Sequence, residues 1–219
     1  MSEIGLGRRV SRDERDLNYL LPRRASRARS RHWYSAGVMD QGGTSQCVAY
    51  SGVKYLTTAP VMNRPIDPVP LYRECLALDE WPGEDFDGGT SVRALFKALK
   101  KRGYVTEYRW ALDAETIVSH VITTGPVVMG TSWHRDMFTP VTTTGYLEIT
   151  GPIEGGHAWL IIGASRDRRN PDGTRGAVRM INSWGDGWGD RGRAWITLTD
   201  LETLVRDDGE ACVATEVKI

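Results

Sequence analysis

Hydrophobic and polar positions follow a helical period through the first half of the chain. In "DGGTSVRALFKALKKRG" the apolar residues fall at positions 92, 95, 96 and 99, and Thr90 or Ser91 precedes them as a cap. Gly103 is placed to end this helix. Further segments that predict helices are 47–58 with Thr44 or Ser45 near its cap, 70–79, and 113–125 with Asp113 as its cap. The first half is therefore expected to be mainly helical.

After Gly125 the pattern changes to β-rich runs separated by glycine turns. These runs are "GPVVMGTSW", "HAWLIIGAS", "AVRMINSW", "GRAWITL" and "ACVATEVKI". One short helix, "TDLETLV", interrupts them, with Thr199 and Glu202 spaced as a capping box. Helices followed by strands favour an α+β fold in which a helical lobe packs against a β lobe. We expect residues 31–124 to form the first lobe, 125–219 the second, and 1–30 a polar, arginine-rich extension.

The extension contains "RRASRARSR" at residues 23–31, which has five arginines in nine positions. Such a run is typical of an arm that binds nucleic acid or an acidic partner, and more often of a solvated segment on the domain surface. Without interleaved aromatic residues it does not favour nucleic acid. A protein partner for this arm stays open.

Composition further narrows the functional classes to which the protein could belong. Lys and Arg number 28 and so do Asp and Glu, so no overall field draws the chain to nucleic acid or an anionic membrane. No apolar run reaches the length of a membrane span, and the N-terminus lacks the apolar core of a secretory signal. Three cysteines do not indicate a disulfide framework. We expect a cytoplasmic protein without a cofactor or metal, because the acidic residues of "GDGWGD" lack metal-ligand spacing.

The candidate chemistry starts at Cys47, which begins a predicted helix. The helix dipole there favours the thiolate, and a thiolate nucleophile needs a basic partner, usually histidine. Of the four histidines, His157 starts a predicted strand directly after "EGG" and can be held rigidly there. Asn182, at the end of the next strand, can orient the imidazole. Taken alone, Cys47 is better explained as a buried structural thiol, the usual state of a free cysteine.

Three motifs settle that choice at the level of the sequence. "QGGTSQCVAYS", "GGHAWLIIG" and "NSWGDGWGDRGRAWI" occur in the order Gln, Cys, His, Asn, and together they resemble the papain-type cysteine peptidases. The segments "DGGTSVRALFKALKKRG" and "GPVVMG" are weaker matches. The resemblance covers roughly residues 31–198. It implies a papain-like fold of two lobes with the active site in the cleft between them.

The resemblance also implies roles for individual residues. Cys47 would be the nucleophile, His157 its ion-pair partner and general acid, and Asn182 the group that orients the imidazole. Gln41 would form the oxyanion hole with the Cys47 backbone N–H. Substrate-side residues implied in the same way are Gly88 and Gly89 along the cleft, Gly156 before the histidine, and Trp184 over the His157–Asn182 hydrogen bond.

The sequence also departs from the family pattern. Thr44 and Phe86 stand where relatives have disulfide cysteines, and Val48 stands where they have tryptophan. The segment before residue 31 is too short to match the long inhibitory propeptide of the secreted enzymes. Either cleavage does not regulate the activity, or the N-terminal extension has another role.

We therefore expect a cysteine peptidase that hydrolyses peptide bonds through a thioester acyl-enzyme. The same residues could serve an amidase, transglutaminase-like or deamidase reaction on cell-wall or side-chain amides. A third alternative is an assembly or binding component, such as part of a virus or phage particle, that retains the fold. Peptide specificity is not predicted by the sequence.

Overall fold

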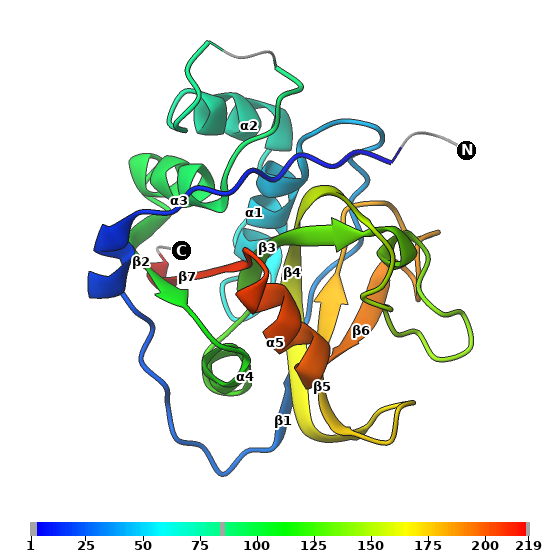
Figure 1. Cartoon of the computed structure of the whole chain (residues 1–219). Coiled ribbons are helices and arrows are strands. Elements are labelled where there is room, and N and C mark those ends of the chain that lie inside the picture. The colour runs from blue at the N-terminus through cyan, green and yellow to red at the C-terminus, as the bar shows by residue number, and fades with distance from the viewer. Residues whose placement is uncertain (1–3, 84–85, 218–219) are drawn as a thin grey trace.

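The computed structural model describes residues 4–83 and 86–217. Its α-helices are α1 (Cys47–Thr57), α2 (Pro68–Leu76), α3 (Val92–Lys101), α4 (Ala114–Thr123) and α5 (Leu198–Arg206). Two short 3-10 helices are η1 (Glu14–Asn18) and η2 (Arg135–Phe138). Figure 1 shows α1, α2 and α3 grouped beside the strands.

The strands form one antiparallel sheet of seven strands. They are β1 (Ser30–His32), β2 (Val105–Ala111), β3 (Val127–His134), β4 (Ile153–Arg169), β5 (Arg175–Ile181), β6 (Arg193–Thr197) and β7 (Glu210–Val217). Their order is β2-β7-β3-β4-β5-β6, and β1 pairs with β4. The last strand therefore lies between β2 and β3 and ties the end of the chain to its first half. The α+β prediction is confirmed.

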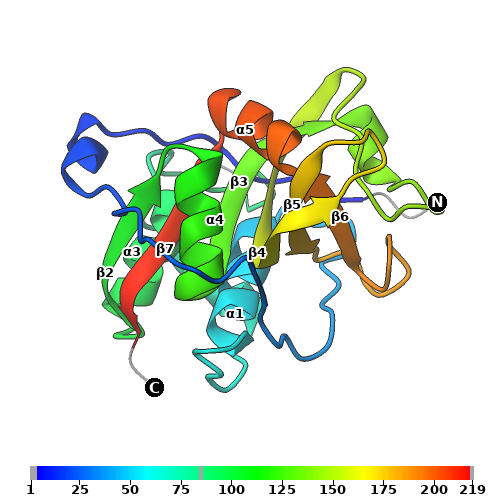
Figure 2. The same ribbon diagram turned by 90° about the horizontal axis from the view of Figure 1, so that it is seen from below.

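The helices cover both faces of the sheet. Val128 and Leu160 face a core shared with α1, α2 and α3. Their neighbours Met129 and Ile161 face a second core shared with α4 and α5. This alternation follows from the two-residue period of a strand, which sends successive side chains to opposite faces. Figure 2 shows α4 and α5 along the strands, with α1 and α3 beyond them.

Several local expectations can now be judged. Ser91 caps α3 by accepting a bond from the Ala94 N–H, and Asp113 caps α4, as predicted. Thr44 and Ser45 lie just before the N-cap of α1, which is Gln46 and makes no side-chain cap bond. The cap of α5 is Thr197 rather than Thr199, since the Thr197 side chain accepts from the Asp200 N–H. The residue bounds expected for the two lobes and the extension stay a prediction.

The three cysteines Cys47, Cys75 and Cys212 are free and buried. Cys75 and Cys212 lie in the hydrophobic core. Within residues 4–83 and 86–217, no helix has the length and apolar character needed to cross a membrane.

The start of the chain lies along the body of the protein. We call residues 4–21 the N-terminal arm and residues 22–29 the tether. The arm (blue in Figure 1) crosses between the helices α1 and α3 and the strands, and then forms η1. It ends in a bridge between Leu20 and Trp110 of β2. The tether is exposed, has no helix or strand, and leads into β1.

Candidate active site

Cys47 is the first residue of α1, and its sulfur contacts β4. Its Sγ accepts a hydrogen bond from the Ala158 backbone N–H at 3.4 Å. Ala158 follows His157 directly in the strand, so this bond brings the start of the helix against the histidine strand. The two elements are 111 residues apart in the sequence at this contact. The structure thus brings Cys47 and the His157 segment together, as the motif order predicts.

The imidazole of His157 is held by Asn182. The distance from His157 Nε2 to Asn182 Oδ1 is 2.7 Å, and the Ser183 backbone N–H donates to the same oxygen at 2.8 Å. Because an amide oxygen only accepts, Nε2 carries the proton in this arrangement. The other nitrogen, Nδ1, is buried and has no hydrogen-bond partner among the described residues. It is therefore available to take a proton.

Aromatic rings enclose this pair. The Trp184 ring centroid lies 4.4 Å from that of His157, and the Trp133 centroid lies 4.8 Å away. Trp133 and Trp184 also meet edge to face at 5.1 Å. Such rings keep water from the His157–Asn182 hydrogen bond, which strengthens it in the lower local dielectric. Trp184 was identified in the sequence, whereas Trp133 was not.

Gln41 lies in the loop before α1 with its side-chain amide fixed at both ends. Its Oε1 accepts from Ser183 Oγ at 2.6 Å. Its Nε2 donates to the Thr44 carbonyl at 2.6 Å and to the Gly5 carbonyl of the arm at 3.1 Å. Gln41 Nε2, which the family resemblance assigns to the oxyanion hole, thus already donates to the Gly5 carbonyl oxygen of the arm.

The N-terminal arm fills the cleft between the cysteine and histidine segments. The Gly7 and Arg8 N–H groups donate to the Gly156 carbonyl at 3.0 and 2.9 Å. On the other side, Thr90 N–H donates to the Gly7 carbonyl, and Arg9 N–H donates to the Thr90 carbonyl, both at 2.9 Å. Arg8 and Thr90 form a parallel bridge. Beneath the arm, Cys47 and His157 are each 0% exposed.

Glycines permit this close approach. A Cβ at Gly7 would lie 2.1 Å from the Ser45 carbonyl oxygen, and one at Gly156 would lie 2.1 Å from the Arg8 carbonyl oxygen. Real side chains cannot occupy either place unless the backbone shifts. Gly89 likewise contacts the arm, since its Cβ would lie 2.3 Å from the Gly7 oxygen. Of the glycines predicted to line the cleft, Gly89 and Gly156 contact the arm, and Gly88 is exposed.

Part of the chain is similar in sequence to the Cathepsin B-like cysteine proteinase 3 of Ostertagia ostertagi. The two are 30% identical over 125 residues, which are 56% of this chain and 67% of that protein. The chain belongs to the papain-like family of cysteine peptidases. The predictions of this family and of a cysteine peptidase are confirmed. No protein-family model matches the chain.

Solved structures agree on the fold of this papain-like peptidase. Xylellain, a cysteine protease from Xylella fastidiosa, has a TM-score of 0.77 at 16% identity and covers 100% of this chain and 98% of its own. The proCathepsin B S9 of Trypanosoma congolense has a TM-score of 0.68 at 14% identity, over 96% and 86% of the two chains. The predicted papain-like two-lobe fold is confirmed.

Burial under the arm sets the charge state of the candidate pair in this papain-like peptidase. Burial raises the pKa of the Cys47 thiol to about 11, although backbone N–H groups act in the opposite direction. Burial lowers the pKa of His157 to about 4, against the effect of its bond to Asn182. Between these values both groups are neutral. Burial thus acts against the thiolate expected at the helix start while the arm is in place.

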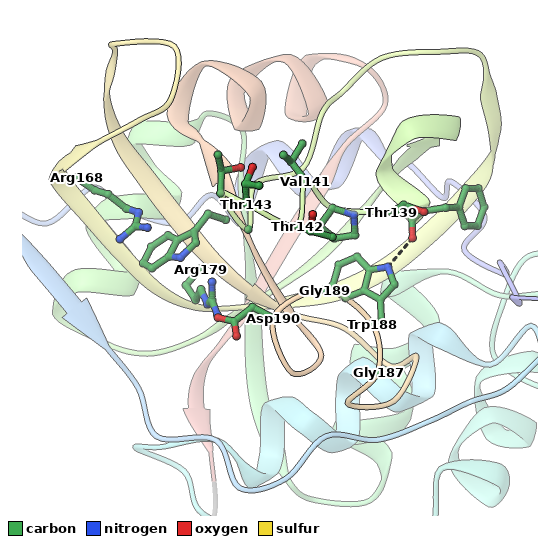
Figure 3. A pocket seen from close by; sticks show the side chains of 15 residues that line it. Thr139, Val141, Thr142, Thr143, Arg168, Arg179, Gly187, Trp188, Gly189 and Asp190 are labelled. Carbon is green, nitrogen blue, oxygen red and sulfur yellow. Dashed lines mark hydrogen bonds and ion pairs between the residues drawn. The ribbon is translucent and has the colours of Figure 1, made fainter.

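A separate surface pocket lies beyond Trp188. It has a cavity volume of about 620 Å³. Figure 3 shows threonines of the 139–144 loop on one side of it and Arg168, Arg179 and Asp190 on the other. Arg179 pairs with Asp190, and Trp188 Nε1 donates to the Phe138 carbonyl at 2.8 Å. None of the predicted site residues lines this pocket.

The occupied cleft is the main feature that the sequence analysis missed. The signal that could have indicated it is "GLG" at residues 5–7, where two glycines flank a leucine within a charged segment. The arm is short, but residues 5–9 are enough to cross the cleft between the cysteine and histidine segments. Its contact with Gly89, Gly156 and Gln41 gives the arm a role that its composition did not predict.

Proposed function

We propose that this peptidase hydrolyses peptide bonds with Cys47 as nucleophile, His157 as acid and base, and Asn182 as the group that orients the imidazole. The observation that carries the proposal is the state of the His157 ring. Asn182 holds Nε2, while Nδ1 is left buried and unpartnered within the described part of the chain. This is the arrangement that a proton-accepting imidazole requires beside a thiol.

The proposed reaction begins when the Cys47 thiol proton moves to His157 Nδ1. The thiolate then attacks the carbonyl carbon of the substrate, and the carbonyl electron pair moves to the oxygen. When this intermediate collapses, the C–N bond breaks and His157 gives its proton to the leaving amine. Water then attacks the thioester while His157 takes one of its protons. The C–S bond breaks, which releases the carboxylic acid, and His157 returns the proton to the Cys47 sulfur.

Gln41 is proposed to stabilise the oxyanion together with the Cys47 N–H. Support comes from the arm, since Gln41 Nε2 already donates to the Gly5 carbonyl. The amide is fixed through Ser183, so no reorganisation is needed when charge develops on a substrate oxygen.

A substrate is proposed to take over the backbone contacts of the arm. Gly89, Gly156 and Trp184 contact the arm, and Gly88 would shape the exposed rim beside them. Peptides and proteins are the substrates that suit such contacts, because the hydrogen bonds involve backbone groups on both sides. The free thiols are consistent with the reducing cytoplasm expected from the sequence.

We further infer that the arm blocks this cleft without being cut. Trp184 packs on His157 and donates to the Gly5 carbonyl at 3.3 Å, so the leaving half of a substrate would extend toward Gly5. The acyl half would then extend toward Arg8. Because the acyl half is the N-terminal half of a substrate, the arm runs in the opposite direction.

The proposal can be tested on the full chain by opening the cleft. Gly7→Val places atoms against the Ser45 carbonyl and should displace the arm. We expect the Gly7→Val protein to cleave an unstructured protein substrate into peptides. An epoxide inhibitor of cysteine peptidases should add to this protein once, at Cys47. Adding Cys47→Ser to Gly7→Val should abolish both the cleavage and the inhibitor adduct. Adding Cys75→Ala instead, which also removes a buried thiol, should leave the cleavage and the adduct unchanged.

Intact mass of the protein and of its products provides the measurement. If the protein with Cys47→Ser still produces peptides, a group other than Cys47 is responsible for the cleavage. An adduct at Cys47 without any peptide products would reject peptide-bond hydrolysis while leaving a reactive thiol.

A further inference from the structure

The surface pocket beyond Trp188 is positively charged. The charged side chains that line it are Arg168, Arg179 and Asp190. Two guanidiniums and one carboxylate leave one positive charge in the pocket without a balancing charge, because arginine stays protonated in proteins. The cavity volume of about 620 Å³ is large enough for a small organic molecule. The pocket therefore favours a ligand that carries a negative charge.

Arg179 forms the buried part of this pocket. Its side chain is 9% exposed, and its Nη2 donates to Asp190, whose side chain is 58% exposed. Arg179 pairs across β5 and β6 with Trp195, and its guanidinium lies 5.0 Å from the centroid of that ring. The buried cation thus depends on a carboxylate that is mostly in solvent. A carboxylate supplied by a ligand can compete with Asp190 for this guanidinium.

Arg168 is held in place by groups without a formal charge. Its guanidinium lies 3.7 Å from the Trp195 ring centroid, and its Nε donates to Tyr146 Oη at 2.8 Å. Tyr146 Oη donates in turn to Asn170 Oδ1 at 2.8 Å. Among the described residues no carboxylate pairs with Arg168. Its terminal nitrogens can therefore bind a ligand without first breaking an ion pair, and its side chain is already oriented.

The opposite wall of the pocket presents hydroxyl groups. Figure 3 shows Thr142 and Thr143, both exposed, across the pocket from Arg168 and Arg179. A hydroxyl can donate to an oxygen or accept from an N–H. This wall therefore suits a ligand that continues beyond its charged group with amides or other polar groups.

We propose that this pocket is a binding site for a carboxylate group, with Arg168 as its first partner and Arg179 as its second. A carboxylate fits the planar fork of a guanidinium, and its single charge balances the unpaired cation. A phosphate monoester would bring about 1.5 to 2 negative charges next to Asp190 and fits less well. The carboxylate can belong to a small organic acid or to the C-terminus of a peptide.

This site is separate from the proposed peptidase function, because none of the predicted catalytic residues lines the pocket. Its test is therefore direct binding rather than hydrolysis. Isothermal titration calorimetry would use the full-length protein with Cys47→Ser, which lacks the proposed nucleophile and so leaves peptide probes intact. The probes are acetyl-alanyl-alanine, its C-terminal amide, sodium acetate and inorganic phosphate, all at one ionic strength.

We expect acetyl-alanyl-alanine to bind at least about tenfold more tightly than its amide, because a hydrogen bond to a charged group is stronger than one to a neutral group. The acetate titration separates the two sources of the carboxylate. Acetate that binds as tightly as acetyl-alanyl-alanine would identify the carboxylate alone as the ligand. Acetate that binds at least about tenfold more weakly would identify the C-terminus of a peptide.

Three variants locate the binding. Arg168→Gln removes the unpaired guanidinium and should weaken the binding of acetyl-alanyl-alanine by about tenfold or more. Asp190→Asn releases Arg179 from its competitor and should tighten the binding by about tenfold, a change that loss of stability would not produce. Arg169→Gln is the matched control, because Arg169 is exposed on the same strand and does not line the pocket. It should change the affinity by less than about twofold.

Four results would overturn the proposal. The first is no binding of acetyl-alanyl-alanine at concentrations up to about 10 mM. The second is equal affinity for the acid and its amide, which would mean that the charge is not recognised. The third is an equal effect of Arg168→Gln and Arg169→Gln, which would indicate a diffuse attraction to the surface. The fourth is tighter binding of phosphate than of either carboxylate probe, which would assign the pocket to another class of ligand.

Discussion

Replacing Gly7 with valine tests how strongly the arm closes the active site. The substitution would force apart the backbone around Gly7, because its Cβ would lie 2.1 Å from the Ser45 oxygen. Four backbone hydrogen bonds link Gly7, Arg8 and Arg9 to Gly156 and Thr90. At about 0.5–1.5 kcal/mol each, their loss removes about 2–6 kcal/mol from the closed form.

We take the lower end of this range, because the Arg8–Glu210 and Arg93–Asp16 ion pairs can still hold the arm near the cleft. About 2 kcal/mol corresponds to about a 30-fold larger open population. Since only the open form binds substrate, kcat/KM should rise by about the same factor over the wild type. The assay is initial-rate hydrolysis of one quenched peptide by both proteins under the same conditions.

Gly187→Val provides the matched control, because a Cβ at Gly187 meets no atom within 4 Å. It should leave kcat/KM within about twofold of the wild type, as a surface substitution normally does. If wild type and Gly7→Val hydrolyse the peptide equally well, while both retain the same melting temperature, the arm does not limit access and the reasoning fails.

The remaining predictions concern charge, transition-state binding and stability. With the arm in place, burial lowers the pKa of His157 from 6.5 to about 4. Protonation of His157 therefore favours the open form as the pH falls through this window. The ratio of wild-type kcat/KM to Gly7→Val kcat/KM should then rise by at most about tenfold per pH unit. In the Gly7→Val background, Gln41→Ala should lower kcat by about 100-fold or more, as measured in peptide hydrolysis. Ser91→Ala removes the cap of α3 and should lower the free energy of unfolding by about 1 kcal/mol in urea titration, whereas Ser26→Ala in the exposed tether should not.

Much of the site could be predicted because its residues lie in local motifs. Cys47 begins a helix, His157 lies in a strand, and Asn182 ends another, so short patterns locate each of them. Their order along the chain was enough to identify the family. Helix caps at Ser91 and Asp113 were predicted for the same reason, since a cap depends on residues three positions apart.

The missed features depend on contacts between distant parts of the chain. The pair of Arg8 and Glu210 spans 202 positions, and neither residue lies in a recognisable motif. Strand β2 was missed because its period-two pattern is short, and its partner β7 comes at the other end of the chain. The α5 cap was placed two residues late because both Thr197 and Thr199 fit the local pattern.

The exposed tether has a thermodynamic consequence for the closed form. While it is intact, the arm is an intramolecular ligand whose effective concentration at the cleft is on the order of millimolar, whatever the amount of protein. A break anywhere in residues 22–29 would make the arm a separate peptide. Closure would then become a bimolecular equilibrium that dilution shifts toward the open enzyme. One hydrolysed bond at the surface would thus make occupancy of the cleft depend on concentration.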